Sequence, residues 1–213
     1  MARPAPRNDH KNIMKPLNHL GFIGGLAIFA AGCASAPSHF YTLDATAERD
    51  AAPTATYGVI VGPVFVPASV DRPQFVLNAA PNRVEMEEFN RWAAPLSDSV
   101  ARVVSVNLGE LLDTARVVSA PMPNFGPAYH VTLRVERFES TRGEGSQDGA
   151  ALLDAVWAVS NPKGEPLVSE HFTQTEPAPG NSFEALAAAH SRNLAKLSRS
   201  LASAIHGAAG EKP

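Results

Sequence analysis

Cysteine is almost absent from this chain, and its apolar runs are short. Cys33 is the single cysteine among 213 residues, so no disulfide can form within the chain. The apolar run over residues 20–31 falls short of the roughly 20 apolar residues that a membrane-spanning helix needs, and no later segment is longer. Stability must therefore come from a hydrophobic core, which a chain of this length can bury as one domain.

The apolar run and its flanks have the form of a secretory signal. Lys11 and Lys15 precede the run, and small residues lead from it into Cys33. A basic segment, a short apolar segment and small residues at the cut site are typical of a cleaved signal peptide. Because a cysteine follows the cut directly, residues 1–32 resemble a bacterial lipoprotein signal, although Ala30 stands where a branched aliphatic residue is usual.

This resemblance implies a lipid anchor on Cys33. In such proteins the thiol receives diacylglycerol and the new amino terminus is acylated after cleavage; we expect no other cofactor. Two or more acyl chains hold a protein firmly on a membrane. Ala34 and Ser35 favour sorting to the outer membrane, facing the periplasm. The alternative is an ordinary cleaved signal with Cys33 as a spare thiol. Met14 is a second possible start of translation, and if translation starts there, residues 1–13 are not part of the protein.

The mature chain is acidic and lacks catalytic motifs. The whole chain carries a net charge of −3 and residues 1–32 carry +3, which leaves about −6 after cleavage. Nucleic-acid binding needs clustered Lys and Arg, so we do not expect that class of partner. The sequence contains no Gly-x-Ser-x-Gly and no His-Glu-x-x-His. Without such motifs we do not expect an enzyme. The histidines are not spaced like metal ligands, so we expect no metal site.

The pattern of apolar residues predicts one α+β domain. We expect a lipidated tether with a short strand over residues 33–56, the domain over 57–207 and a disordered tail over 208–213. Strands are predicted at 40–43, 57–66, 74–78, 83–86, 115–119, 129–139, 150–160 and 167–175. The last three favour an antiparallel meander. We therefore expect a mixed, largely antiparallel sheet with two main helices packed on one face.

The two helices are predicted from apolar residues at steps of three and four. The first begins near Pro95, a residue type favoured at the first helical position, and ends near Leu112. The second follows Asn181, whose spacing to Glu184 is that of a capping box. Its apolar stripe is also heptad-like, so a coiled coil is the alternative to packing on the sheet.

Two segments between the predicted elements have unusual composition. Asp71-Arg72-Pro73-Gln74 places a charged pair and a proline between two strands, and Arg91-Trp92-Ala93-Ala94-Pro95-Leu96 places an aromatic residue and an arginine just before a helix. Trp and Arg often anchor protein interfaces, and loops carry function more often than cores do. The alternative is that both segments are rigid connectors, with Trp92 closing the edge of the sheet.

These segments, in this order, resemble the PqiC family of ABC-type transport auxiliary lipoproteins. The resemblance rests on Cys33, on Tyr41-Thr42-Leu43, on Val64-Phe65-Val66-Pro67 followed by Asp71–Gln74, and on Arg91–Leu96 followed by Asn107-Leu108. It is densest from Tyr57 to Leu112. Beyond Leu112, only the order of strands and helices agrees.

The resemblance implies a non-enzymatic role in lipid transport across a Gram-negative envelope. Partners would be an MCE-domain protein crossing the periplasm and an inner-membrane permease or ABC transporter, with the lipoprotein docking that assembly at the outer membrane. Asp71, Arg72, Pro73, Gln74, Arg91, Trp92, Pro95 and Leu96 are then candidates for a partner or subunit interface, and self-association stays open. Two alternatives remain: a structural lipoprotein of a secretion or cell-wall machine, and an envelope hydrolase.

Overall fold

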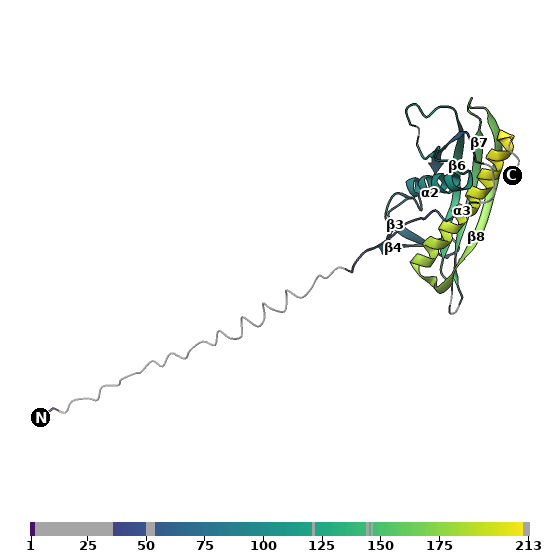
Figure 1. Ribbon diagram of the computed structural model, residues 1–213. Helices are drawn as coiled ribbons and strands as arrows, with labels where there is room; N and C mark the ends of the chain where they lie inside the picture. Colours follow the sequence, from purple (N-terminus) through teal and green to yellow (C-terminus); the bar gives the residue numbers. More distant parts are fainter. Residues whose placement is uncertain (3–35, 50–53, 121, 144, 146, 211–213) are drawn as a thin grey trace. The chain divides into compact units, whose positions relative to one another are not determined.

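The computed structural model describes residues 1–2, 36–49, 54–120, 122–143, 145 and 147–210 (Figure 1). Contacts divide the chain into a unit Met1–Ala36 and a compact unit Pro37–Pro213. Cys33 and all but the first two residues of the predicted signal lie outside the described residues. None of the helices in the described ranges is both long enough and apolar enough to span a membrane.

Eight described strands form one branched sheet whose central strand is β6. The strands are β1 (His39–Tyr41), β2 (Gly58–Phe65), β3 (Gln74–Ala80), β4 (Arg83–Trp92), β5 (Val117–Val118), β6 (Ala128–Thr141), β7 (Gly149–Ser160) and β8 (Pro166–Ala178). On one side β6 pairs with β7, and β7 with β8. On its other side β6 pairs first with β2 and then, at Ser140, with β3. The long β6 thus connects the meander to both remaining groups of strands.

The direction of the strands corrects the prediction of a largely antiparallel sheet. Four pairings among the described strands are parallel, namely β1 with β4, β2 with β5, β2 with β6 and β3 with β6. Three are antiparallel, namely β3 with β4, β6 with β7 and β7 with β8. The sheet is mostly parallel by pairing, although the predicted hairpin and meander are present. Local turns favour antiparallel neighbours, whereas the parallel pairs join strands far apart in the chain.

Helix α2 (Leu96–Leu111) forms where the apolar periodicity predicts it. Pro95 is the residue just before the first turn, and it makes no side-chain cap. The face that carries Val100, Val103, Val104 and Leu108 is fully buried. Because these residues recur at steps of three and four, one side of α2 packs on the core and the other faces solvent.

Helix α3 (Phe183–Ala209) is capped one residue later than predicted. Ser182, not Asn181, is the N-cap, and its side chain accepts a hydrogen bond from the backbone N–H of Ala185 at 3.1 Å. Asn181 instead accepts from the backbone N–H of Gly143 at 2.8 Å, joining the loop after β6 to the start of α3. The helix also extends two residues into the segment expected to be a tail, and ends at Gly210 with a φ of 77°.

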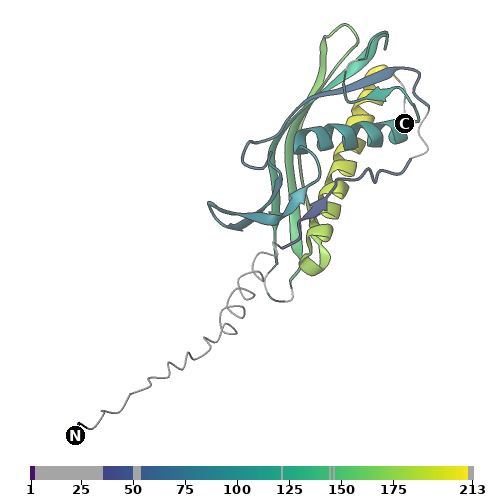
Figure 2. The same cartoon turned by 90° about the vertical axis from the view of Figure 1, so that its left-hand side faces the viewer.

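Both helices cover the same face of the sheet (Figure 2). Burial alternates along the whole of β7, and the alternate residues facing the helices include Leu153 and Trp157, which are 0 % and 1 % exposed. Leu194, Leu197 and Leu201 of α3 are fully buried. Each buried Leu contributes about 1.5–3 kcal/mol relative to an exposed position. The stripe of α3 thus packs against the described domain, as the sheet-packing prediction states.

Candidate functional site

The two unusual segments meet in space. Side chains from Asp71–Pro73 and from Trp92–Pro95 line one cavity of about 380 Å³. The backbone N–H of Trp92 donates to the carbonyl of Pro73 at 2.7 Å, which fixes the two segments side by side. We call this cavity the β3–α2 pocket, since it lies where the chain enters β3 and α2.

The acidic wall of this pocket is tied to helix α2. The Asp71 carboxylate accepts a hydrogen bond from the backbone N–H of Ser97, at 3.4 Å. The first N–H groups of a helix have no partner within the helix, and a carboxylate is favoured there by the helix dipole. Because Pro95 provides no side-chain cap, Asp71 supplies an acceptor from a different segment. The loop before β3 is thereby held against the start of α2.

Trp92 forms the inner wall of the pocket. Its side chain is 7 % exposed and stacks on Phe75 with ring centroids 4.4 Å apart. Phe138 meets the indole edge-on at 6.2 Å. The prediction that Trp92 belongs to a connector is wrong, because β4 continues through it. Most of the Trp92 ring is buried in the core, and one edge of the ring lines the pocket.

The remaining candidate residues have different positions. Arg91 and Gln74 pair across β4 and β3, outside the lining of the pocket, and Arg91 forms an ion pair with Glu88 at 3.1 Å. Leu96 is fully buried in the core. The structure therefore brings Asp71, Arg72, Pro73, Trp92 and Pro95 together at the pocket and leaves the other three beside or beneath it.

Arg72 has the most distinctive environment in the pocket. Its Nη1 lies 2.7 Å from the sulfur of Met86 on β4, and its Nε is buried with no hydrogen-bond partner among the described residues. Buried polar groups are almost always paired, since an unpaired donor costs free energy. A guanidinium recognises carboxylate and carbonyl oxygens well. Arg72 therefore places at the pocket a positive charge that no acidic side chain among the described residues pairs with.

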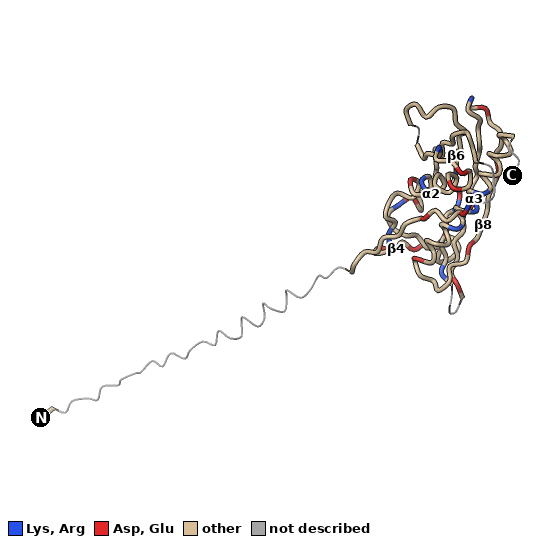
Figure 3. The backbone as a smooth tube through the Cα atoms, in the orientation of Figure 1, with Lys and Arg blue, Asp and Glu red and all other residues tan. Residues whose placement is uncertain are grey.

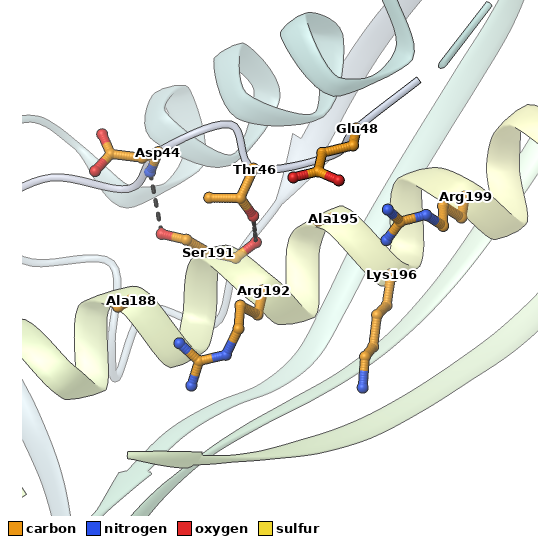
Figure 4. A pocket seen from close by; sticks show the side chains of 9 residues that line it. All are labelled: Asp44, Thr46, Glu48, Ala188, Ser191, Arg192, Ala195, Lys196 and Arg199. Carbon is orange, nitrogen blue, oxygen red and sulfur yellow. Dashed lines mark hydrogen bonds between the residues drawn. The ribbon is translucent and has the colours of Figure 1, made fainter. Parts of the chain in front are cut away.

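A larger cavity, of about 510 Å³, lies between residues 44–48 and α3, and no sequence pattern points to it (Figure 4). Two of its three basic residues, Arg192 and Lys196, bond Glu176 of β8, at 3.0 and 2.5 Å. Burial acts to raise the pKa of Glu176, but hydrogen bonds from Lys196 and Arg192 hold that pKa below its usual value. Asp44 and Glu48 line the same cavity, so its lining carries charges of both signs. Figure 3 shows acidic and basic residues interleaved along the chain as a whole.

Two further places among the described residues contain distinctive titratable side chains. His190 of α3 is fully buried and accepts or donates at the Ser140 hydroxyl, 2.9 Å away; burial lowers its pKa to about 3, so it is a neutral core residue. Glu136, Asp154 and His171, from three adjacent strands, have potential ligand atoms within 4.8 Å of one another. Among the described residues, these three form the group that could hold a metal ion. Their spacing in the sequence does not predict such a site.

Comparison with known proteins decides the family. Residues 41–202 match the family described as ABC-type transport auxiliary lipoprotein component. The chain belongs to this family. The match includes all of the residues that line the β3–α2 pocket, whereas Cys33 lies before it. This lipoprotein is thus an auxiliary component of an ABC-type transport system.

Solved structures agree with the fold of this auxiliary lipoprotein. Protein XCC0632 from Xanthomonas campestris is 20% identical with a TM-score of 0.66, over 81% of this chain and 98% of that one. A second crystal structure, of an uncharacterized protein, is 17% identical with a TM-score of 0.65, over 80% of this chain and 99% of that one. No curated protein matches the sequence. At these identities the similarity shows the fold alone.

Proposed function

We propose that this lipoprotein is non-enzymatic, is anchored to the outer membrane through acylated Cys33, and docks an envelope lipid transport assembly. Its partners are an MCE-domain protein in the periplasm and, through it, the inner-membrane permease or ABC transporter subunits. Membership of the auxiliary lipoprotein family supports the link to a transporter. The resemblance of residues 57–112 to the PqiC family supports the narrower choice of an MCE-type system.

The observation that carries this proposal is the convergence of two sequence motifs on one exposed cavity. Asp71–Pro73 and Trp92–Pro95 are separated by a whole hairpin in the chain, yet they share the lining of the β3–α2 pocket. Four apolar residues are exposed there beside the Arg72 guanidinium, namely Pro73, Ala93, Ala94 and Pro95. An apolar surface with a central arginine fits a protein partner that presents an apolar side chain and an acceptor group.

The other sites of the described domain support a binding role over a catalytic one. Burial holds the pKa of His190 at about 3, which makes it a poor proton acceptor near neutral pH. Arg192 and Lys196 are engaged with Glu176, an arrangement that fastens α3 to β8. Both features stabilise the fold and supply no nucleophile.

The first test is a mild-detergent pull-down of the full-length protein from its own membranes, read by mass spectrometry. Cys33→Ser, which cannot be acylated, is the control for the anchor. We expect an MCE-domain protein with permease or ATPase subunits. Recovery of only cell-wall or secretion components would assign this lipoprotein to another envelope machine and overturn the proposal.

The second test addresses the pocket itself. Arg72→Ala removes the guanidinium but leaves the backbone contacts of the pocket in place, so recovery of the MCE-domain protein should fall at least several-fold. Lys163→Ala, in the exposed turn between β7 and β8, is the matched loss of one positive charge far from the pocket along the chain. Equal recovery with both variants would show that the pocket is not the contact.

A further inference from the structure

Exposed apolar side chains concentrate on two neighbouring strands. In the unit Pro37–Pro213, eight large apolar side chains are strongly exposed among the described residues, and four of them belong to β1 and β4. These four are Phe40, Val84, Met86 and Phe89, exposed by 64, 52, 58 and 40 %. We call them the β1–β4 patch. Scattered exposed apolar residues are ordinary, but a concentration on one surface indicates an interaction site.

The pairing of the strands explains why part of the patch faces away from the core. Tyr41 lies beside Trp92 in the register of β1 and β4, and Tyr41 packs edge-on against Phe75 in the core. Because side chains alternate along a strand, Phe40 points to the opposite face. Met86 lies opposite Val76 in the register of β4 and β3, and Val76 alternates with the core residues Phe75 and Leu77, so Met86 and Val84 also face away from the core. Phe89 lies two residues before Arg91, the partner of Phe40 in the register, and shares the face of Phe40. The patch is thus a consequence of the strand pattern.

The charges around the patch balance, because Arg72, Arg83 and Arg91 stand against Glu85, Glu87 and Glu88. Arg83 lies 3.7 Å from Glu85, and Arg91 lies 3.1 Å from Glu88. The Arg72 guanidinium is directed at Met86 itself. These pairs give the rim of the patch little net charge, so its partner is recognised through apolar contact and not through attraction of opposite charges. A zwitterionic lipid surface fits such a rim.

The position of the patch along the chain indicates what covers it. Phe40 lies only seven positions after Cys33. A fully extended chain spans at most about 3.6 Å per residue, so Phe40 can lie no more than about 25 Å from an acylated Cys33. β1 pairs directly with β4, and Figure 2 shows the short purple arrow of β1 beside the teal β3–β4 hairpin. β1 is therefore held within this distance of the anchored residue, and the neighbouring β4 carries the rest of the patch.

We infer that the β1–β4 patch contacts the headgroup region of the bilayer that holds the lipid anchor, with a zwitterionic phospholipid surface as its occupant. This inference rests on the proposed acylation of Cys33. Aromatic and apolar side chains at a membrane interface are stabilised by burial among headgroups and upper acyl chains. The contact sets the orientation of the domain on the membrane and places the adjoining Arg72 and the β3–α2 pocket close to the bilayer surface.

The chain offers a direct test, because the acylated Cys33 leaves no free thiol. The full-length lipoprotein is made with a single new cysteine, Met86→Cys or Phe89→Cys, and labelled with a polarity-sensitive fluorophore. It is then reconstituted into phosphatidylcholine vesicles with and without nitroxide-labelled lipid. We expect blue-shifted emission and quenching at least threefold stronger than at the control positions. Raising the salt concentration should not change the quenching.

Leu167→Cys and Met122→Cys are the controls, since both positions carry exposed apolar side chains away from β1 and β4. Leu167 of β8 lies near the end of the sheet that contains His130 of β6. Ser140, where β3 pairs with β6, is ten residues further along β6. That separation is about 33 Å. Similar unfolding temperatures of all four labelled proteins would verify that the fold is retained.

Vesicle flotation separates the two proposals. If the protein does not float with vesicles, the anchor at Cys33 fails and this inference fails with it. If the protein floats but all four labels are quenched equally, the anchor stands and the patch does not touch lipid. If the Met86 and Phe89 labels respond only after a periplasmic protein extract is added, a protein covers the patch, and the lipid assignment is wrong.

Discussion

The indole ring of Trp92 lies nearly parallel to the ring of Phe75, with centroids 4.4 Å apart and an interplanar angle of 24°. This pair joins the end of β4 to the start of β3, directly behind the β3–α2 pocket. Aromatic pairs contribute beyond the area that they bury. One side of Trp92 therefore stabilises the core, and its margin shapes the surface that we assign to partner binding.

Trp92→Ala should act on stability before it acts on binding. Removing a buried Trp leaves a cavity and costs about 3–5 kcal/mol of unfolding free energy. We expect a clear loss in a chemical unfolding experiment. Trp92→Phe keeps a ring against Phe75 and should cost less than half as much. Equal stability of the wild type and Trp92→Ala would mean that the stacking of Trp92 on Phe75 contributes nothing to the free energy of unfolding.

Ala94→Arg should act on binding alone. Ala94 is exposed and lines the β3–α2 pocket, so a long charged side chain would fill the pocket without disturbing the core. Surface substitutions of this kind usually change stability by about 0.5 kcal/mol or less. We expect a normal unfolding transition together with a loss of at least tenfold in recovery of the MCE-domain partner. An unchanged recovery would contradict the docking role of the pocket.

His190 predicts a dependence of stability on pH. Its pKa is lowered by burial to about 3, against an ordinary value of 6.5, so between these values the unfolded chain binds a proton that the folded chain does not. Stability should therefore be complete above pH 6.5 and decline as the pH falls toward 3. At pH 5 the decline relative to pH 7.5 is about 2 kcal/mol.

The matched variant for this prediction is His190→Gln, which retains a group that can bond the Ser140 hydroxyl but does not titrate. Urea unfolding at pH 7.5 and pH 5 provides the measurement. The difference in unfolding free energy between the two pH values should be smaller in the variant by about 2 kcal/mol. If both proteins lose stability in parallel, other groups cause the acid sensitivity.

Ser182→Ala tests the corrected start of α3. The Ser182 hydroxyl accepts from the N–H of Ala185 and replaces one of the hydrogen bonds missing at a helix start. Loss of an N-cap costs about 1 kcal/mol. Thermal unfolding should therefore occur several degrees lower than in the wild type, and Ser182→Asp should restore it. A full effect in Asn181→Ala with none in Ser182→Ala would support the cap that the sequence indicates.

Local patterns in the sequence predicted most of the elements. Alternation along residues 150–160 and steps of three and four along residues 96–112 correspond to β7 and to α2. Such periodicities depend only on backbone geometry and on which face is buried, so they can be seen without a partner. The start of α3 was missed by one residue because Asn181 and Ser182 are both good caps, and the loop contact of Asn181 with Gly143 decides between them.

The pairing of distant strands was decided only by the tertiary structure. β2 pairs with β6, and β1 pairs with β4, both in parallel, and no turn sequence predicts these pairings. The two motifs that resemble the PqiC family were visible in the sequence, but their shared cavity depends on the hairpin that returns Trp92 to Pro73. By itself the sequence determined which residues are buried together in each element and which motifs are unusual. Only the packing of the elements decided which of these motifs meet, because contacts between distant residues follow from the whole core and not from local spacing.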